Sequence, residues 1–144
     1  MSEQPIKASD NALELMKQRG LGALADKMGI ELLELSAERA VATMPVAGNT
    51  QPIGLLHGGA HVVLAESLGS FAANVHAHPW GYAVGIELNA THHSSITEGI
   101  VTGTCVAIKL GKTLTSHEIS MTDETGRLLS TVRITTRSCS TLLC

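Results

Sequence analysis

The sequence is short of aromatic side chains and of positive charge. Phe71, Trp80 and Tyr82 are the only Phe, Trp and Tyr residues, and 10 Lys and Arg stand against 13 Asp and Glu, for a net charge of −3. Surfaces that bind nucleic acid need basic stripes and aromatic stacking platforms. The composition therefore argues against nucleic acid as a partner.

Long apolar runs are also absent. No window approaches the ~18 uninterrupted apolar residues of a membrane span, and the opening MSEQPIKASD lacks the charged-then-apolar layout of a signal peptide. The cysteines, Cys105, Cys139 and Cys144, show no CxxC spacing and are expected to be unpaired, as fits a reducing compartment. We therefore expect a cytoplasmic protein that does not act at a membrane.

The chain is long enough for a substantial core, with 144 residues of which 44% are hydrophobic and 16% charged. One domain over residues 1–144 is predicted. The segment SDNALELMKQRG combines an Asn/Asp cap, good helix formers and a closing Gly20, and with GALADKM as its continuation it predicts an N-terminal helix over about residues 9–26. Residues 29–46 predict one extended strand or a bent pair, and AGNTQPIG predicts a loop.

A second helix is predicted from the glycine pair Gly58 and Gly59 to about His76. Glycines suit a helix entrance, where backbone N–H groups are free and the macrodipole is positive. Apolar residues then cover nearly the whole circumference, so this helix should be buried rather than amphipathic. Glu66, Ser70 and Asn74, at i, i+4 and i+8, form a polar strip along it.

After this helix the sequence changes to β-rich runs. GYAVGIELNATHH, GIVTGTCVAIKL, TLTSHEISMTD and RLLSTVRITTRS are separated by turn-forming residues, which predicts a four-stranded antiparallel meander. One buried helix before a meander predicts an α+β fold in which a curved sheet wraps a central helix. The core of the domain should span about residues 27–138.

Three of these segments carry a family resemblance. QPIGLLHGGAHVVLAESLGS, VGIELNATHH and LGKT, with the closing Thr/Arg-rich strand, resemble the hotdog-fold acyl-CoA thioesterases over about residues 25–138. The similar branch includes 4-hydroxybenzoyl-CoA, 1,4-dihydroxy-2-naphthoyl-CoA and enterobactin-proofreading thioesterases. The resemblance implies an acyl-CoA substrate, no cofactor, and a homodimer or a homotetramer built as a dimer of dimers, with each active site between subunits.

Glu66 is the first candidate catalytic residue. It lies in an apolar segment with no Lys or Arg nearby in sequence, and a buried carboxylate without a partner costs several kcal/mol or is driven to its neutral form. The alternative is that it caps or bridges a group in the core. The resemblance implies a catalytic carboxylate, either nucleophile or general base, and thioester hydrolysis suits one because the leaving thiol has a pKa of about 8.5.

The helix entrance supplies the other candidates. Free N–H groups there, with Gly58 allowing close approach, can polarise a thioester carbonyl. The resemblance further implies that Gln51 forms a hydrogen bond at the thioester, that His57 contacts the reacting group, and that Ser70 lies beside the attacking water. From the residues alone Gln51 and Ser70 could equally be an ordinary loop amide and helical serine.

A histidine pair, His92 and His93, ends the first strand of the meander. The resemblance makes His92 a contact for the ring or hydroxyl of an aromatic acyl group, whereas the pair alone could simply be solvated. His57 and His61, with Glu66, could form a metal site, but the HExxH pattern is missing and thioester cleavage needs no Lewis acid, so no metal is expected.

The phosphates of coenzyme A need positive charge or backbone donors. The hairpin segment KLGKT offers Lys109, Gly111, Lys112 and Thr113 for this role, although surface cations are more often simply solvated.

Three functions follow from these observations. The first is hydrolysis of an aromatic acyl-CoA or of an acyl group on a carrier protein. The second is an enoyl-thioester hydratase or dehydratase, which would need a His/Asp pair and is disfavoured because no Asp occurs between Asp26 and Asp123. The third is a noncatalytic acyl-CoA-binding module, against which Glu66 argues.

Overall fold

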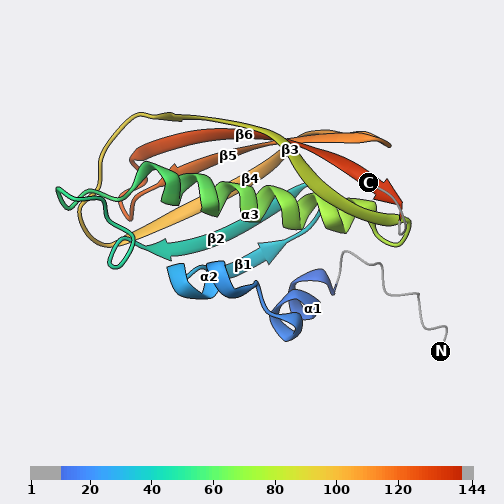
Figure 1. The fold of residues 1–144 in the computed structure, drawn as a ribbon, viewed down its shortest axis with the longest axis horizontal. Coiled ribbons are helices and arrows are strands. Elements are labelled where there is room, and N and C mark those ends of the chain that lie inside the picture. Colours follow the sequence, from blue (N-terminus) through green and yellow to red (C-terminus); the bar gives the residue numbers. More distant parts are fainter. Residues whose placement is uncertain (1–10, 141–144) are drawn as a thin grey trace.

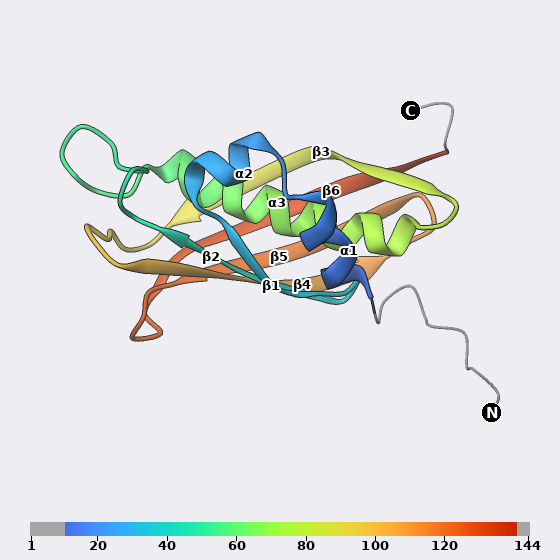
Figure 2. The same cartoon turned by 90° about the horizontal axis from the view of Figure 1, so that it is seen from below.

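A 20-residue helix, α3 (Gly58–Ala77), lies across one face of a six-stranded antiparallel sheet in the computed structural model, which describes residues 11–140 (Figure 1). The strand order is β1-β2-β4-β5-β6-β3, so β3, which follows the helix in sequence, forms one edge of the sheet (Figure 2). The predicted helix wrapped by an antiparallel sheet is confirmed. The predicted four-stranded meander is wrong at its first strand, because β4, β5 and β6 follow one another in the sheet but β3 pairs with β6 and not with β4. The strands are β1 (Glu31–Leu35), β2 (Arg39–Pro45), β3 (Gly81–His92), β4 (Ile100–Leu110), β5 (Leu114–Thr122) and β6 (Leu128–Ser140).

The N-terminal helical segment is divided in two. The first helix, α1 (Ala12–Arg19), ends at Gly20, and the second, α2 (Ala23–Met28), begins after Gly22. Both glycines have positive φ angles, 85° and 99°, which interrupt the helix that the sequence predicted as continuous. In the fold α1 packs against β1, and α2 contacts α3.

Residues 29–46 form the bent pair of strands, β1 and β2, which pair antiparallel. The loop that follows is pinned by Asn49, whose Nδ2 donates to the carbonyls of Met28 and Pro45 over 2.8 Å each. The carbonyl of Asn49 in turn accepts the N–H of His57 over 2.9 Å. These bonds fix the point at which α3 begins.

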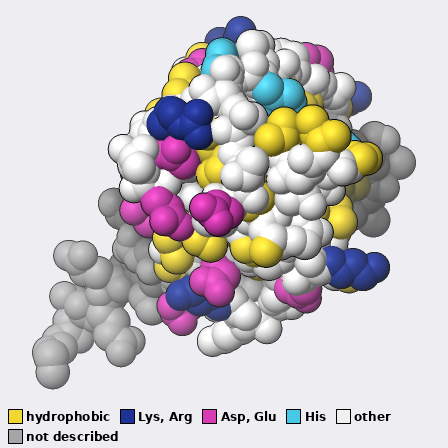
Figure 3. All heavy atoms as spheres, turned by 90° about the vertical axis from the view of Figure 1, so that its left-hand side faces the viewer, with side chains coloured by type: hydrophobic (Ala, Val, Ile, Leu, Met, Phe, Trp, Pro, Cys, Tyr) yellow, Lys and Arg dark blue, Asp and Glu magenta, His cyan; other side chains and the backbone are white. Residues whose placement is uncertain are grey.

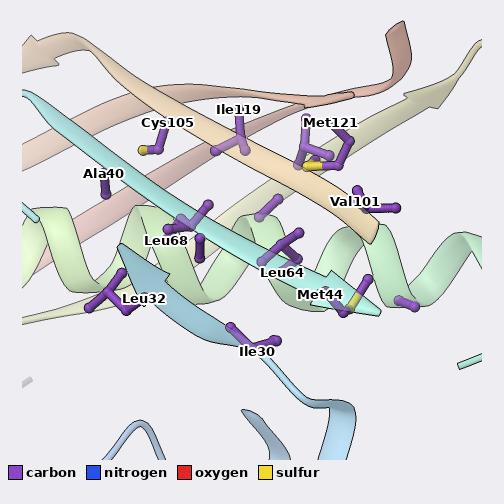
Figure 4. Packing of buried hydrophobic residues seen from close by; sticks show 14 of the residues in the cluster. Ile30, Leu32, Ala40, Met44, Leu64, Leu68, Val101, Cys105, Ile119 and Met121 are labelled. Atoms are coloured by element: carbon purple, nitrogen blue, oxygen red, sulfur yellow. The ribbon is translucent and has the colours of Figure 1, made fainter. Parts of the chain in front are cut away.

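Only one face of α3 is buried against the sheet. Leu64 and Leu68 are fully enclosed there, and a Cβ on Gly103 of β4 would come within 2.8 Å of Leu68, so this glycine permits the close approach of helix and sheet (Figure 4). The expectation of a helix buried all round is wrong, because the sheet covers one side of it. The polar strip stays outside this core, with Glu66 exposed and Ser70 and Asn74 partly buried.

The edge strand β3 has no partner on its outer side among the strands of residues 11–140. It is 12 residues long, pairs with β6, and carries a bulge between Gly85 and Glu87. Three large apolar side chains on it are exposed, Tyr82, Val84 and Ile86. A long edge of this kind is a template for pairing with another chain.

The cysteines differ from their expected state. Cys105 is free and buried, and burial raises its pKa to about 12, whereas Cys139 is disulfide-bonded, so the expectation of unpaired cysteines is wrong there. Cys144 lies outside the described residues. No helix within residues 11–140 is long and apolar enough to cross a membrane. The cytoplasmic location and the single domain over residues 1–144 stay predictions.

Candidate active site

The entrance of α3 leaves the backbone N–H of Gly58 free within residues 11–140. His57 caps the helix, because its Nδ1 accepts the N–H of Gly59 over 2.8 Å, and its carbonyl accepts the N–H of Ala60 over 2.9 Å. The N–H of Gly58 has no hydrogen-bond partner within the described part of the chain. The macrodipole of a helix is positive at this end, so the Gly58 N–H is placed to bind an oxygen that gains negative charge. Of the N–H groups predicted to be free here, Gly59 is already bound.

Gly58 faces the ring of His92 at the end of β3. A Cβ on Gly58 would come within 2.7 Å of His92 Nε2, so only glycine fits this contact without displacement. On its other side, His92 Nδ1 lies 2.9 Å from Ser130 Oγ, and that hydroxyl donates its only proton to the carbonyl of Thr91 over 3.1 Å. Nδ1 must therefore donate to Ser130, which leaves Nε2 of the neutral ring as a hydrogen-bond acceptor.

Gln51 contributes a second donor to the same region. Its Oε1 accepts the N–H of Ile53 over 2.6 Å, which orients the side-chain amide. Its Nε2 has no hydrogen-bond partner among residues 11–140. Gln51 borders a hollow of about 290 Å³, termed here the entrance pocket. This pocket is lined by Gln51, Leu55, Leu56, Gly58, His61, His92, His93, Ser94, Ser95 and Ile96.

Glu66 lies on a different part of the helix, against the edge strand. A Cβ on Gly85 of β3 would be 3.2 Å from Glu66 Oε1, so the carboxylate rests over a gap in the side chains of that strand. Its side chain is exposed in the single chain, so the prediction of a buried carboxylate is wrong for one chain on its own. Ser70, one helical turn further on, is partly buried on the same strip.

A single chain does not bring the predicted catalytic residues together. Gln51, His57 and Gly58 meet at the helix entrance, with His92 beside them. Glu66 follows Gly58 by eight residues, which at ~1.5 Å per residue places it about 12 Å further along the helix axis. That distance is too long for Glu66 and the Gly58 N–H to act on one carbonyl group.

The predicted coenzyme A segment lies at the opposite end of α3. His76 Nε2 donates to the carbonyl of Gly111 over 2.9 Å, which ties the β4–β5 turn to the end of the helix. Gly111 is required in this turn, since a Cβ there would come within 2.4 Å of the Leu114 carbonyl oxygen. Lys112 borders a hollow of about 410 Å³ together with His76 and Trp80, whereas Lys109 and Thr113 are exposed nearby.

One end of the molecule carries a group of acidic side chains. Acidic side chains gather on the face where α3 begins (Figure 3), and Glu98, Asp123 and Glu124 line a hollow there. Hydrogen bonds from Thr125 and Arg127 hold the pKa of the Asp123 carboxyl well below its usual range. No group of three or more His, Cys, Asp or Glu side chains in residues 11–140 is arranged to hold a metal ion.

Sequence reasoning gave little weight to two side chains of this region. His61 entered only as a metal ligand, yet it is buried in the entrance pocket next to His92. Asn74 entered only as part of the polar strip, yet it binds the backbone of β3 at Ala83. The available signal was their polar character within an apolar helix.

A long helix packed across an antiparallel sheet, with a free backbone donor at the helix entrance, defines a hotdog-fold protein equipped to polarise a carbonyl group. The sequence profile of the Thioesterase superfamily matches residues 53–130, which include all of α3 and β3. The chain belongs to this superfamily, and it is a hydrolase that acts on thioester bonds.

Individual relatives support the same conclusion. The chain is 41% identical over 125 residues to the proofreading thioesterase EntH of Cronobacter turicensis, covering 86% of this chain and 91% of that protein. It is 42% identical over 125 residues to the 1,4-dihydroxy-2-naphthoyl-CoA hydrolase of Escherichia coli, covering 86% and 92%. The crystal structure of a thioesterase from Haemophilus influenzae matches with a TM-score of 0.84 and 32% identity, covering 90% of this chain and 92% of that one.

Proposed function

We propose that the enzyme hydrolyses a hydroxylated aromatic acyl-CoA at a site that two copies of the chain build together. The observation that carries this proposal is the separation of the two half-sites in one chain. The donors Gly58 N–H and Gln51 Nε2 border the entrance pocket, while Glu66 lies on the outer strip of α3 beside β3. Each half lacks the group that the other supplies.

Pairing of two edge strands would unite the halves. Glu66 rests beside Gly85, in the first half of β3, and Gly58 faces His92, at the end of β3. If β3 pairs antiparallel with β3 of a second copy, the first half of each strand lies next to the end of the other. Glu66 of one copy then approaches the entrance pocket of its partner. The pairing would also cover the exposed Tyr82, Val84 and Ile86.

The reaction follows from this arrangement. The Gly58 N–H and Gln51 Nε2 bind the thioester oxygen and stabilise the charge that develops on it. Glu66 either attacks the carbonyl carbon directly or removes a proton from a water molecule that attacks it, and Ser70 lies one turn away to bind that water. The carbon–sulfur bond breaks, the thiol leaves with a proton, and water supplies the oxygen and hydrogen of the acid. His57 orders the donors through its cap on Gly59.

The acyl group is inferred from His92. Its Nε2 is an acceptor on the wall of the entrance pocket, and the matching substrate group is a hydroxyl that donates a proton. A relative is named for a substrate with this chemistry, 1,4-dihydroxy-2-naphthoyl-CoA.

The nucleotide part of coenzyme A is assigned to the other end of the helix. Lys112, with Lys109 close by, supplies positive charge, and Thr113 offers its backbone N–H. Gly111 shapes the turn that carries these groups, and the exposed Trp80 offers a stacking surface. The acidic face where α3 begins would repel phosphates (Figure 3). His76 lies ten residues beyond Glu66, about 15 Å along the helix at ~1.5 Å per residue.

The assembly is proposed as a dimer, or as a tetramer of two dimers, in the cytoplasm. An acyl-carrier protein could present the same thioester group in place of coenzyme A. A hydratase or dehydratase would need a His/Asp pair. The entrance pocket is lined by His61, His92 and His93 but by no Asp, and Nε2 of His93 is already bonded to Thr131.

The test is release of free thiol from a panel of benzoyl, hydroxybenzoyl, short aliphatic and enoyl-CoA thioesters, followed colorimetrically. Hydroxybenzoyl-CoA should be hydrolysed with the highest kcat/KM. Hydration of the enoyl thioester without thiol release would favour the hydratase reading, and tight binding without turnover of any thioester would favour the binding module.

A further inference from the structure

His61 is a buried polar side chain that the proposed reaction leaves without a role. It lies in the first turn of α3, is 4% exposed, and lines the entrance pocket. Its ring centre is 5.4 Å from that of His92, with the two planes tilted by 33°. Its Nδ1 is enclosed and has no hydrogen-bond partner among residues 11–140.

The ring of His61 is neutral at ordinary pH. Burial, and to a smaller extent the nearby charge of His92, lower its pKa from 6.5 to about 4. A neutral imidazole carries one N–H donor and one acceptor nitrogen. Buried polar side chains in folded proteins are almost always hydrogen-bonded. Because Nδ1 is enclosed, a ligand in the entrance pocket can meet this ring only at Nε2, which is not enclosed and also lacks a hydrogen-bond partner among residues 11–140.

His61 and His92 together offer complementary groups to a ligand. His92 Nε2 is an acceptor, because Nδ1 of that ring donates to Ser130. His61 can donate through its single N–H. Two hydrogen bonds to one oxygen, each about 2.8 Å long, join nitrogens up to roughly 5.5 Å apart. Rings whose centres are 5.4 Å apart can therefore share one oxygen atom between them.

We propose that His61 is a specificity-determining residue that, together with His92, clamps one hydroxyl group of the acyl moiety. The hydroxyl donates its proton to His92 Nε2 and accepts the N–H of His61. A hydroxyl satisfies both rings at once, whereas a carbonyl or ether oxygen cannot donate and an apolar ring edge satisfies neither. This inference rests on the proposed function and narrows its substrate to acyl groups that place a hydroxyl deep in the entrance pocket.

The test compares benzoyl-CoA with 2-, 3- and 4-hydroxybenzoyl-CoA in the wild type and in His61→Phe and His61→Gln. Phe keeps the ring but removes both nitrogens, whereas Gln keeps an amide donor close to the position of Nε2. The wild type should prefer one hydroxybenzoyl isomer over benzoyl-CoA. In His61→Phe this preference should fall roughly 10-fold to 100-fold, as expected when one buried hydrogen bond is lost, and His61→Gln should recover part of it.

His117 provides a matched control for packing. It is fully buried on β5, its Nδ1 also lacks a partner within the described chain, and it lies outside the entrance pocket. His117→Phe should lower Tm but leave the preference for hydroxybenzoyl-CoA unchanged. To separate binding from turnover, the Kd values of the preferred isomer and of benzoyl-CoA are also measured in the Glu66→Gln background, where His61→Phe should shift their ratio by a similar factor.

Two results would overturn the inference. One is an equal loss for hydroxylated and plain benzoyl-CoA in His61→Phe with a wild-type circular dichroism spectrum. The other is a wild-type enzyme that hydrolyses benzoyl-CoA as well as every hydroxylated isomer. In both cases thioester hydrolysis by Glu66 would stand, whereas absence of thiol release from all substrates would refute the proposed function itself.

Discussion

Asn74 joins the central helix to the edge strand through a two-way hydrogen bond with Ala83. The N–H of Ala83 donates to Asn74 Oδ1 over 2.9 Å, and Asn74 Nδ2 donates to the carbonyl of Ala83 over 3.1 Å. This pairing replaces the backbone bonds that a neighbouring strand would supply, and it fixes β3 beside the polar strip. Glu66 lies two turns away on the same strip, against Gly85.

Glu66→Gln should abolish most turnover while the fold survives. Gln keeps the volume of the side chain but can act neither as a nucleophile nor as a base. Thiol release and circular dichroism are the measurements, and acyl-CoA binding should persist. Turnover within about threefold of wild type would contradict the assigned role.

Asn74→Ala should lower kcat more than it raises KM. The substitution removes both bonds to Ala83, so β3 and the carboxylate that rests on it lose their fixed spacing. Loss of two partly buried hydrogen bonds should also cost about 1–3 kcal/mol of stability. Steady-state kinetics and chemical denaturation measure the two effects. Ser67→Ala is the control, because Ser67 Oγ bonds only within the helix, to the carbonyl of Val63.

The shared site can be tested by mixing two inactive variants. Glu66→Gln lacks the carboxylate, and Gly58→Ala should block the helix entrance because its Cβ would meet His92 Nε2. When subunits exchange, half of the dimers are mixed and each contains one intact site, so the mixture should regain about a quarter of wild-type activity. If the mixture stays inactive while native mass spectrometry detects mixed dimers, both halves belong to one chain.

His92→Ala should lower kcat/KM for a hydroxybenzoyl-CoA by an amount that corresponds to roughly 1–3 kcal/mol of transition-state stabilisation. The kcat/KM for a short aliphatic acyl-CoA should stay nearly unchanged. His93→Ala is the comparison, since His93 borders the same pocket but its Nε2 is already bonded to Thr131 over 2.9 Å. A larger loss from His93→Ala would show that the wrong histidine has been assigned to the substrate.

Stability should fall as the pH is lowered from about 6.5 toward 4. Burial depresses the pKa of His61 to about 4 and also lowers that of His117, where the Ala37 carbonyl acts in the opposite direction and His76 in the same one. Below pH 6.5 the unfolded chain binds protons that the folded chain excludes, which favours unfolding. For His61 the loss is roughly 3 kcal/mol, at about 1.4 kcal/mol per pKa unit.

This pH dependence is measured by denaturant unfolding at several pH values. His61→Phe should flatten the slope between pH 6.5 and 4, because the substituted chain has one fewer group that titrates on unfolding. His78→Asn, which replaces an exposed histidine, should leave the slope as it is. An unchanged slope in His61→Phe would refute a neutral, buried His61.

Local signals predicted the architecture well. The glycine pair at Gly58, the alternating run in β6 and the turn at Gly111 each depend on neighbours in sequence, and all lie where the sequence placed them. The exposure of Glu66 could not be predicted in this way. It depends on how far the sheet curves around the helix, which is decided by pairings between distant strands such as β3 and β6.

The role proposed for His61 could not be predicted from the sequence for a related reason. A histidine in an apolar helix can face the core, a ligand or solvent, and the sequence does not distinguish these cases. The distinction comes from the approach of His92, which is 31 residues away in sequence and reaches the helix entrance only through the register of β3 on β6.

The clamp formed by Asn49 has a consequence for protein engineering. Asn49 holds the helix entrance by bonding the carbonyl of Met28 at the end of α2, so the segment before β1 supports the proposed oxyanion donor from a distance. Truncating the chain past Met28 to simplify expression would release one side of this clamp. A purification tag or fusion partner is therefore better attached to a chain that keeps α2 intact, and crystallisation trials on shortened versions should be accompanied by an activity assay.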